Sequence, residues 1–134
     1  MIQYTIVKKK VLTGSHPGEI KYYPKIVRAK TIDTDEVAEL LQQRTTLGES
    51  EVRAFLNGLS QAISYYVCAS YPVEVEGLGR FTPSIKAKAM DSPEAVTVST
   101  ITHKGVNYSP TMEMKRKLEK VKFIKAGLKS AHYL

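Results

Sequence analysis

The side chains that most often carry catalytic or metal chemistry are few and dispersed in this sequence. The histidines are His16, His103 and His132, and the one cysteine is Cys68. The histidines are far apart and have no cysteine or carboxylate at the spacing of metal ligands. No nucleophile motif or activated-cysteine context is present. The sequence therefore predicts a protein that is not an enzyme, with no metal site, no cofactor and no small-molecule substrate.

Basic side chains are the more informative set. The 134 residues include 20 Lys and Arg against 13 Asp and Glu, a formal net charge of +7. Residues 1–30 hold seven basic and one acidic residue, residues 31–76 hold two and eight, and residues 77–134 hold eleven and four. This layout favours a surface with one positive and one negative face, and a positive face attracts polyanions. Ordinary solubilising charge is the alternative explanation.

The beginning of the chain has the pattern of a β-hairpin. Ile2, Tyr4 and Ile6 alternate with polar residues, which indicates a strand. A turn-rich stretch at 13–18 precedes a second strand over 20–28. The lysines at 8–10 follow the apolar stretch, the reverse of a secretory signal, and a lone cysteine suits a reducing compartment. We therefore expect a cytoplasmic protein.

A helical hairpin follows the predicted β-hairpin. Asp33 and Glu36 form a capping-box pattern at the start of a helix that should end near residues 44–46. A second helix opens at Gly48, and Pro72 stops it. Residues 54–73 carry no charge but include Asn, Gly, Ser, Gln and Pro, unlike a membrane span. We therefore expect no membrane insertion but a helix buried on more than one side, which suggests a second subunit.

The last third of the chain alternates strands and turns. Residues 73–76 and 80–89 have strand patterns, and residues 91–94 form a turn. We expect a return strand from Val96 and Val98 toward Ile101, another strand piece over 105–108, and a last helix capped by Ser109 or Thr111. The predicted order is β-β-α-α-β-β-β-α.

Three stretches in this order carry a resemblance to a known family. They are the helical hairpin from Val37 to Val67, the strand and turn VEVEGLGRF at 73–81, and VNYSPTMEMK at 106–115. Together they resemble the HU/integration host factor family over residues 2–125. More specifically, the sequence is similar to the histone-like DNA-binding proteins of Bacteroidetes-type bacteria, which carry an extra N-terminal β-element.

The resemblance implies an α+β, HU-like fold. Its parts are a β-hairpin, a helical hairpin, a three-stranded sheet with a protruding β-arm, and a C-terminal helix. We expect one domain at 1–125, with the hairpin extension at 1–30 and the HU core at 31–125, followed by a tail at 126–134. The family implies an intertwined homodimer that binds and bends double-stranded DNA in the nucleoid with little sequence preference.

The resemblance also singles out candidate DNA contacts on an arm at 82–101 and near it. Pro93 lies 12 residues after Phe81, where the family places a proline that wedges between base steps. The alternative for Pro93 is a turn proline, because Asp91 and Glu94 flank it. The candidate phosphate contacts, for which solvated surface charge is the alternative, are Arg80, Lys86, Lys88, Lys104, Lys115 and Arg116.

The sequence also departs from the family pattern. The arm has few basic residues, and Thr111-Met112 stands where the family has Gly-Lys. These departures keep a second hypothesis open, in which the fold serves as a structural or protein-interaction module with weak or no DNA binding.

Overall fold

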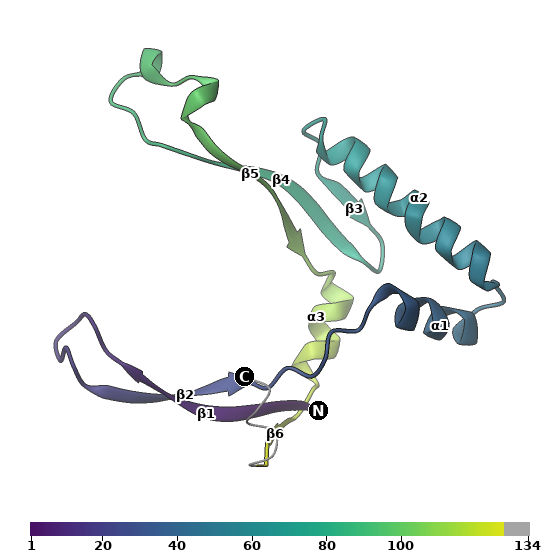
Figure 1. Cartoon of the computed structure of the whole chain (residues 1–134), viewed down its shortest axis with the longest axis horizontal. Helices are drawn as coiled ribbons and strands as arrows, with labels where there is room; N and C mark the ends of the chain where they lie inside the picture. Colours follow the sequence, from purple (N-terminus) through teal and green to yellow (C-terminus); the bar gives the residue numbers. More distant parts are fainter. Residues whose placement is uncertain (128–134) are drawn as a thin grey trace. The chain divides into compact units, whose positions relative to one another are not determined.

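The computed structural model describes residues 1–127 and falls into two compact units (Figure 1). One unit combines residues 1–32 with the chain from Lys117 onward, and the other comprises residues 33–116. Most of the predicted C-terminal tail, residues 128–134, lies outside the described residues.

The first unit contains a three-stranded sheet in the order β2-β1-β6. Strands β1 (Ile2–Lys10) and β2 (Ile20–Ile26) are antiparallel, so the predicted hairpin is present. Strand β6 (Phe123–Lys125) was not predicted. It runs parallel to β1 with Phe123 beside Ile2. The sheet thus joins the first and last described segments of the chain.

The second unit begins with the predicted helical hairpin, α1 (Thr34–Arg44) and α2 (Glu49–Val67). The capping box is confirmed: the Glu36 N–H donates to Asp33 Oδ1 at 2.9 Å, and the Asp33 N–H donates to Glu36 Oε2 at 3.3 Å. Gly48 is the N-cap of α2, as predicted. These local hydrogen bonds satisfy backbone donors that a helix start leaves without intrahelical partners.

One side chain links the two helices. Arg53 of α2 donates to the Asp35 carboxylate of α1 at 2.5 Å and to Glu49 at 3.4 Å. The hydrogen bond to Asp35 is the main cause that raises the pKa of the Arg53 guanidinium above its ordinary value. The pair is solvent-exposed, so it contributes little to the stability of the fold.

The helices bury little apolar surface within one chain. Among the described residues, the buried apolar side chains are Ala38, Val52 and Val67, whereas Phe55 and Tyr65 of α2 are 63% and 73% exposed. One chain alone therefore leaves a side of α2 exposed, and the prediction that a second subunit covers it stays a prediction. Among the residues that the structure describes, no helix is both long and apolar enough to cross a membrane.

The second unit also holds the predicted three-stranded sheet. Strands β3 (Val73–Val75), β4 (Gly79–Ala87) and β5 (Ile101–Ser109) are antiparallel in that order. The segment predicted at 105–108 is part of β5.

The predicted start of the return strand needs correction. Val98 lies in a 3₁₀ turn, η2 (Val98–Thr100), and Val96 ends another, η1 (Pro93–Ala95), so β5 begins only at Ile101. Within η2, the Thr100 N–H and hydroxyl both donate to the Thr97 carbonyl, at 3.0 and 2.6 Å. These local bonds replace strand pairing at the positions where alternation predicted a strand.

Helix α3 (Met112–Glu119) begins where predicted. Of the two expected caps, Thr111 is the one used, because its hydroxyl accepts the Met114 N–H at 3.2 Å. Ser109 is instead the last residue of β5.

Gly79 starts β4 in a conformation that only glycine adopts easily. Its φ is +147°, and an added Cβ would lie 2.5 Å from the Tyr108 ring and 2.6 Å from the Ser109 carbonyl oxygen. We predict that Gly79→Ala lowers the free energy of unfolding by about 1–3 kcal/mol, the cost of a strained backbone. Urea denaturation at fixed protein concentration measures the change.

Gly58→Ala is the matched control for this substitution. Gly58 lies inside α2, and an added Cβ meets nothing within 4 Å. Alanine is the better helix former, so the control should gain about 0.5–1 kcal/mol. Equal effects of the two substitutions would contradict the role assigned to Gly79.

Candidate nucleic-acid interface

The β4–β5 ribbon presents one polar face. In an antiparallel pair, directly opposed residues lie on the same face, and alternate residues along a strand share it. Arg80, Thr82, Ser84 and Lys86 of β4 are opposed by Ser109, Asn107, Gly105 and His103 of β5. We call these eight residues the polar arm face. It combines two cations with hydroxyl, amide and imidazole groups, all of which bind phosphate oxygens in proteins.

The opposite face of the same ribbon is apolar. Phe81, Pro83 and Ile85 are opposed by Tyr108, Val106 and Lys104. The rings of Phe81 and Tyr108 lie 5.4 Å apart, and the Tyr108 hydroxyl donates to the Leu78 carbonyl at 2.7 Å. The register therefore separates the predicted cations, with Arg80 and Lys86 on the polar arm face and Lys104 on the other.

The polar arm face includes residues that the sequence did not suggest. Thr82, Ser84, His103 and Asn107 join Arg80 and Lys86 only because of the β4–β5 register. Alternation along 80–86 was the available signal for Thr82 and Ser84. No local pattern identified His103 and Asn107, since their position depends on pairing with a strand about 20 residues away.

The ribbon continues beyond the regular strands to a tip. The Lys88 N–H donates to the Thr100 carbonyl at 2.9 Å, which extends the pairing past the bulge at Lys86 and Ala87. Pro93 is the first residue of η1, in the segment between β4 and β5. Both Lys88 and Pro93 are exposed.

The tip is acidic and apolar rather than basic. Asp91 and Glu94 flank Pro93 and are exposed. Three apolar side chains of this part of the arm are also exposed: Met90, Val96 and Val98. Cations are therefore found along the ribbon, while its end presents apolar groups.

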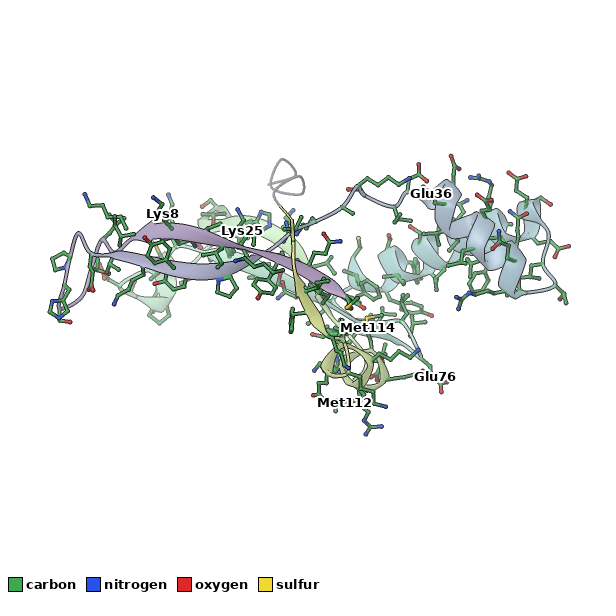
Figure 2. All side chains as sticks on the ribbon, turned by 90° about the horizontal axis from the view of Figure 1, so that it is seen from below. Lys8, Lys25, Glu36, Glu76, Met112 and Met114 are labelled. Carbon is green, nitrogen blue, oxygen red and sulfur yellow. The ribbon has the colours of Figure 1, made fainter. Side chains whose placement is uncertain are left out.

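The last two candidate residues lie on α3, which follows β5 directly. Lys115 and Arg116 are exposed and occupy successive positions, so they project about 100° apart around the helix. The start of α3 contacts the ribbon through the Tyr108 hydroxyl, 3.8 Å from Met114 Sδ. Met112 and Met114 are labelled on this helix in Figure 2.

Within residues 1–127, no three His, Cys, Asp or Glu side chains lie close enough together to hold a metal ion. All seven candidate contacts fall between residues 80 and 116, inside the second compact unit. The site is thus an exposed polar surface on a ribbon, without a metal centre in the described part of the chain.

Helical hairpin, three-stranded sheet and projecting ribbon together define an α+β protein with an HU-like fold. A family model described as "HU domain fused to wHTH, Ig, or Glycine-rich motif" matches residues 1–125. The chain belongs to this HU-HIG family.

A solved structure shares this fold. It is the crystal structure of a protein from Bacteroides vulgatus ATCC 8482, described as a "putative bacterial DNA binding protein", with a TM-score of 0.69 and 9% sequence identity. The match covers 94% of this chain and 48% of the other, so this chain spans about half the length of that protein. No curated protein matches the sequence.

Proposed function

We propose that the protein is a homodimeric, non-enzymatic, architectural protein of the bacterial nucleoid that binds double-stranded DNA with little sequence preference. The observation that carries the proposal is the polar arm face, which places Arg80 and Lys86 on one side of an exposed ribbon. Membership of an HU-domain family and the described function of the Bacteroides protein support it.

The chemistry of the polar arm face suits the DNA backbone. Arg80 and Lys86 neutralise phosphates, which releases condensed counterions and supplies sequence-independent affinity. Thr82, Ser84 and Asn107 add neutral hydrogen bonds that orient the ribbon on the duplex. Such contacts do not read base edges, so binding depends on the shape and deformability of the duplex.

The tip acts differently from the ribbon. Pro93 and its exposed apolar neighbours, Met90, Val96 and Val98, form a wedge that inserts between base steps. Unstacking a step costs about a few kcal/mol, which further phosphate contacts on the bent DNA offset. Asp91 and Glu94 are repelled by phosphates and therefore point away from the backbone.

Lys88, Lys104, Lys115 and Arg116 extend the basic surface. Lys88 lies further along the arm, and Lys115 and Arg116 lie at the other end of β5 on α3. Lys104 contributes less than Lys86, because it lies on the apolar face of the ribbon.

The dimer follows from the exposed side of α2. Phe55 and Tyr66 are 63% and 51% exposed and lie on one side of the helix, since eleven residues complete slightly more than three turns. A second copy of the chain covers these aromatic rings. Burial of this kind stabilises by about 25 cal/mol per Å² of apolar surface.

Lys86→Gln and Lys104→Gln test the assignment of the polar arm face. Each variant removes one charge. The two lysines belong to neighbouring residue pairs of the ribbon but lie on opposite faces. We predict that Lys86→Gln lowers the slope of log affinity against log salt by about 0.9 for each phosphate contact removed, and that Lys104→Gln changes it less. Fluorescence anisotropy with a duplex of about 30 base pairs measures both.

The same titration decides between DNA binding and the interaction-module hypothesis. If Lys86→Gln and Lys104→Gln lower the salt slope equally, the assignment of DNA binding to the polar arm face is contradicted. Absence of binding at low salt by a folded, dimeric protein would overturn the proposed function and favour a protein-interaction module.

Pro93→Ala tests the wedge. We predict a smaller bend angle by fluorescence energy transfer between the ends of the duplex, and a somewhat lower salt slope, because less strongly bent DNA brings fewer further phosphates into contact. Ser92→Ala, one residue away, is the control and should leave the bend unchanged. A full bend in the Pro93 variant would show that the proline only shapes the turn.

Phe55→Glu tests the dimer. We predict that a charge on the exposed aromatic side of α2 converts the protein to a monomer in sedimentation velocity. Ser60→Glu is the control, since Ser60 is exposed and lies about 140° around the helix from Phe55. A Phe55 variant that is folded by circular dichroism and still dimeric would overturn this interface.

A further inference from the structure

The β1–β2 hairpin sorts its residues into two unlike faces. Three opposed pairs share one face: Thr5 with Lys25, Val7 with Tyr23, and Lys9 with Lys21. We call these six residues the basic hairpin face. Lys8 and Lys10 lie on the other face, opposite Tyr22 and Ile20. Figure 2 shows Lys8 and Lys25 on the hairpin.

The basic hairpin face contains an electrostatic conflict. Lys9 and Lys21 are directly opposed, and like charges in such positions destabilise a strand pair. Residues 1–30 contain one acid, Glu19, which lies 3.2 Å from Lys21 on the exposed surface. Glu19 offsets part of the repulsion between the two lysines, and a bound polyanion would offset the remainder.

An aromatic ring lies between the cationic ends of this face. Tyr23 is the middle residue of the three on β2, and the Lys9 ammonium group is 6.0 Å from its ring centroid. Lysines beside an exposed aromatic ring are typical of surfaces that bind nucleic acids.

We propose that the basic hairpin face is a second DNA-binding surface, which contacts the phosphates of a duplex independently of the β4–β5 arm. Lys25 and Lys21 are four residues apart on β2, which corresponds to about 13 Å. The major groove of B-DNA is about 12 Å wide and admits a two-stranded ribbon. The two ends of the face therefore reach phosphates on opposite sides of one groove, with Tyr23 between them.

This inference rests on the proposed function but uses a different unit of the chain. The hairpin belongs to the first compact unit and the arm to the second. Two binding surfaces on one chain raise the overall affinity by effective concentration, without any need for a fixed arrangement of the units.

The test compares Lys9→Gln/Lys21→Gln with Lys8→Gln/Lys10→Gln. Both double variants remove two charges from the same hairpin, and they differ in the face affected. We expect the first to lower the salt slope by about 1.8, for two lost phosphate contacts, and the second to leave it nearly unchanged. Circular dichroism and thermal unfolding verify that both variants are folded. The first variant should be about as stable as the unmodified protein, because removal of the like-charge pair offsets the loss of the exposed Lys21–Glu19 ion pair.

Lys86→Gln in the same series separates this inference from the proposed function. If both hairpin variants keep the salt slope of the unmodified protein and only Lys86→Gln lowers it, the proposed hairpin surface is overturned and the proposed arm surface stands. If only Lys9→Gln/Lys21→Gln lowers the salt slope, the result supports the hairpin surface and contradicts DNA binding by the arm. No binding by the unmodified protein would overturn both.

Discussion

The pairing of β4 with β5 is the constraint on which the candidate site depends. Because side chains alternate with a period of two, a slip of one residue would exchange the polar and apolar faces of the ribbon. Close packing at its base sets the register: the Tyr108 ring and the Ser109 carbonyl occupy the space where Gly79 has no side chain. The Tyr108 hydroxyl adds a hydrogen bond to Leu78. Gly79 thereby helps to fix the register that places Arg80 and Lys86 on the polar arm face.

Few apolar side chains are buried within one chain, which is consistent with the proposed dimer. Ala38, Val52 and Val67 are the buried apolar residues in the described part of the chain, and so small a core contributes little to offset the conformational entropy lost on folding. The exposed rings on α2 are the apolar surface available for further burial. In the proposed dimer, burial of these rings would add to the stability of the fold, so the measured stability would depend on protein concentration.

Features with local causes could be predicted from the sequence, and features with distant causes could not. The capping box of Asp33 and Glu36 acts within four residues, so the start of α1 was predicted correctly. Strand β6 has three residues and exists through pairing with β1 at the other end of the chain. The position of Lys104 opposite Ile85 likewise depends on long-range register. The alternation at Val96 and Val98 was misleading because hydrogen bonds within the 3₁₀ turns take precedence there.

The charge distribution along the arm is compatible with the proposed DNA binding in spite of the acidic tip. In the proposed complex, the ribbon needs cations where it lies beside the DNA backbone, and Arg80 and Lys86 would supply them. An inserted tip lies between base steps, where a cation has no phosphate to contact and apolar groups are favoured. Acids beside Pro93 then keep the tip from resting on the backbone, because phosphates repel them. The arm is not uniformly basic, and this fits two different proposed roles: the ribbon binds phosphates, and the tip deforms the duplex.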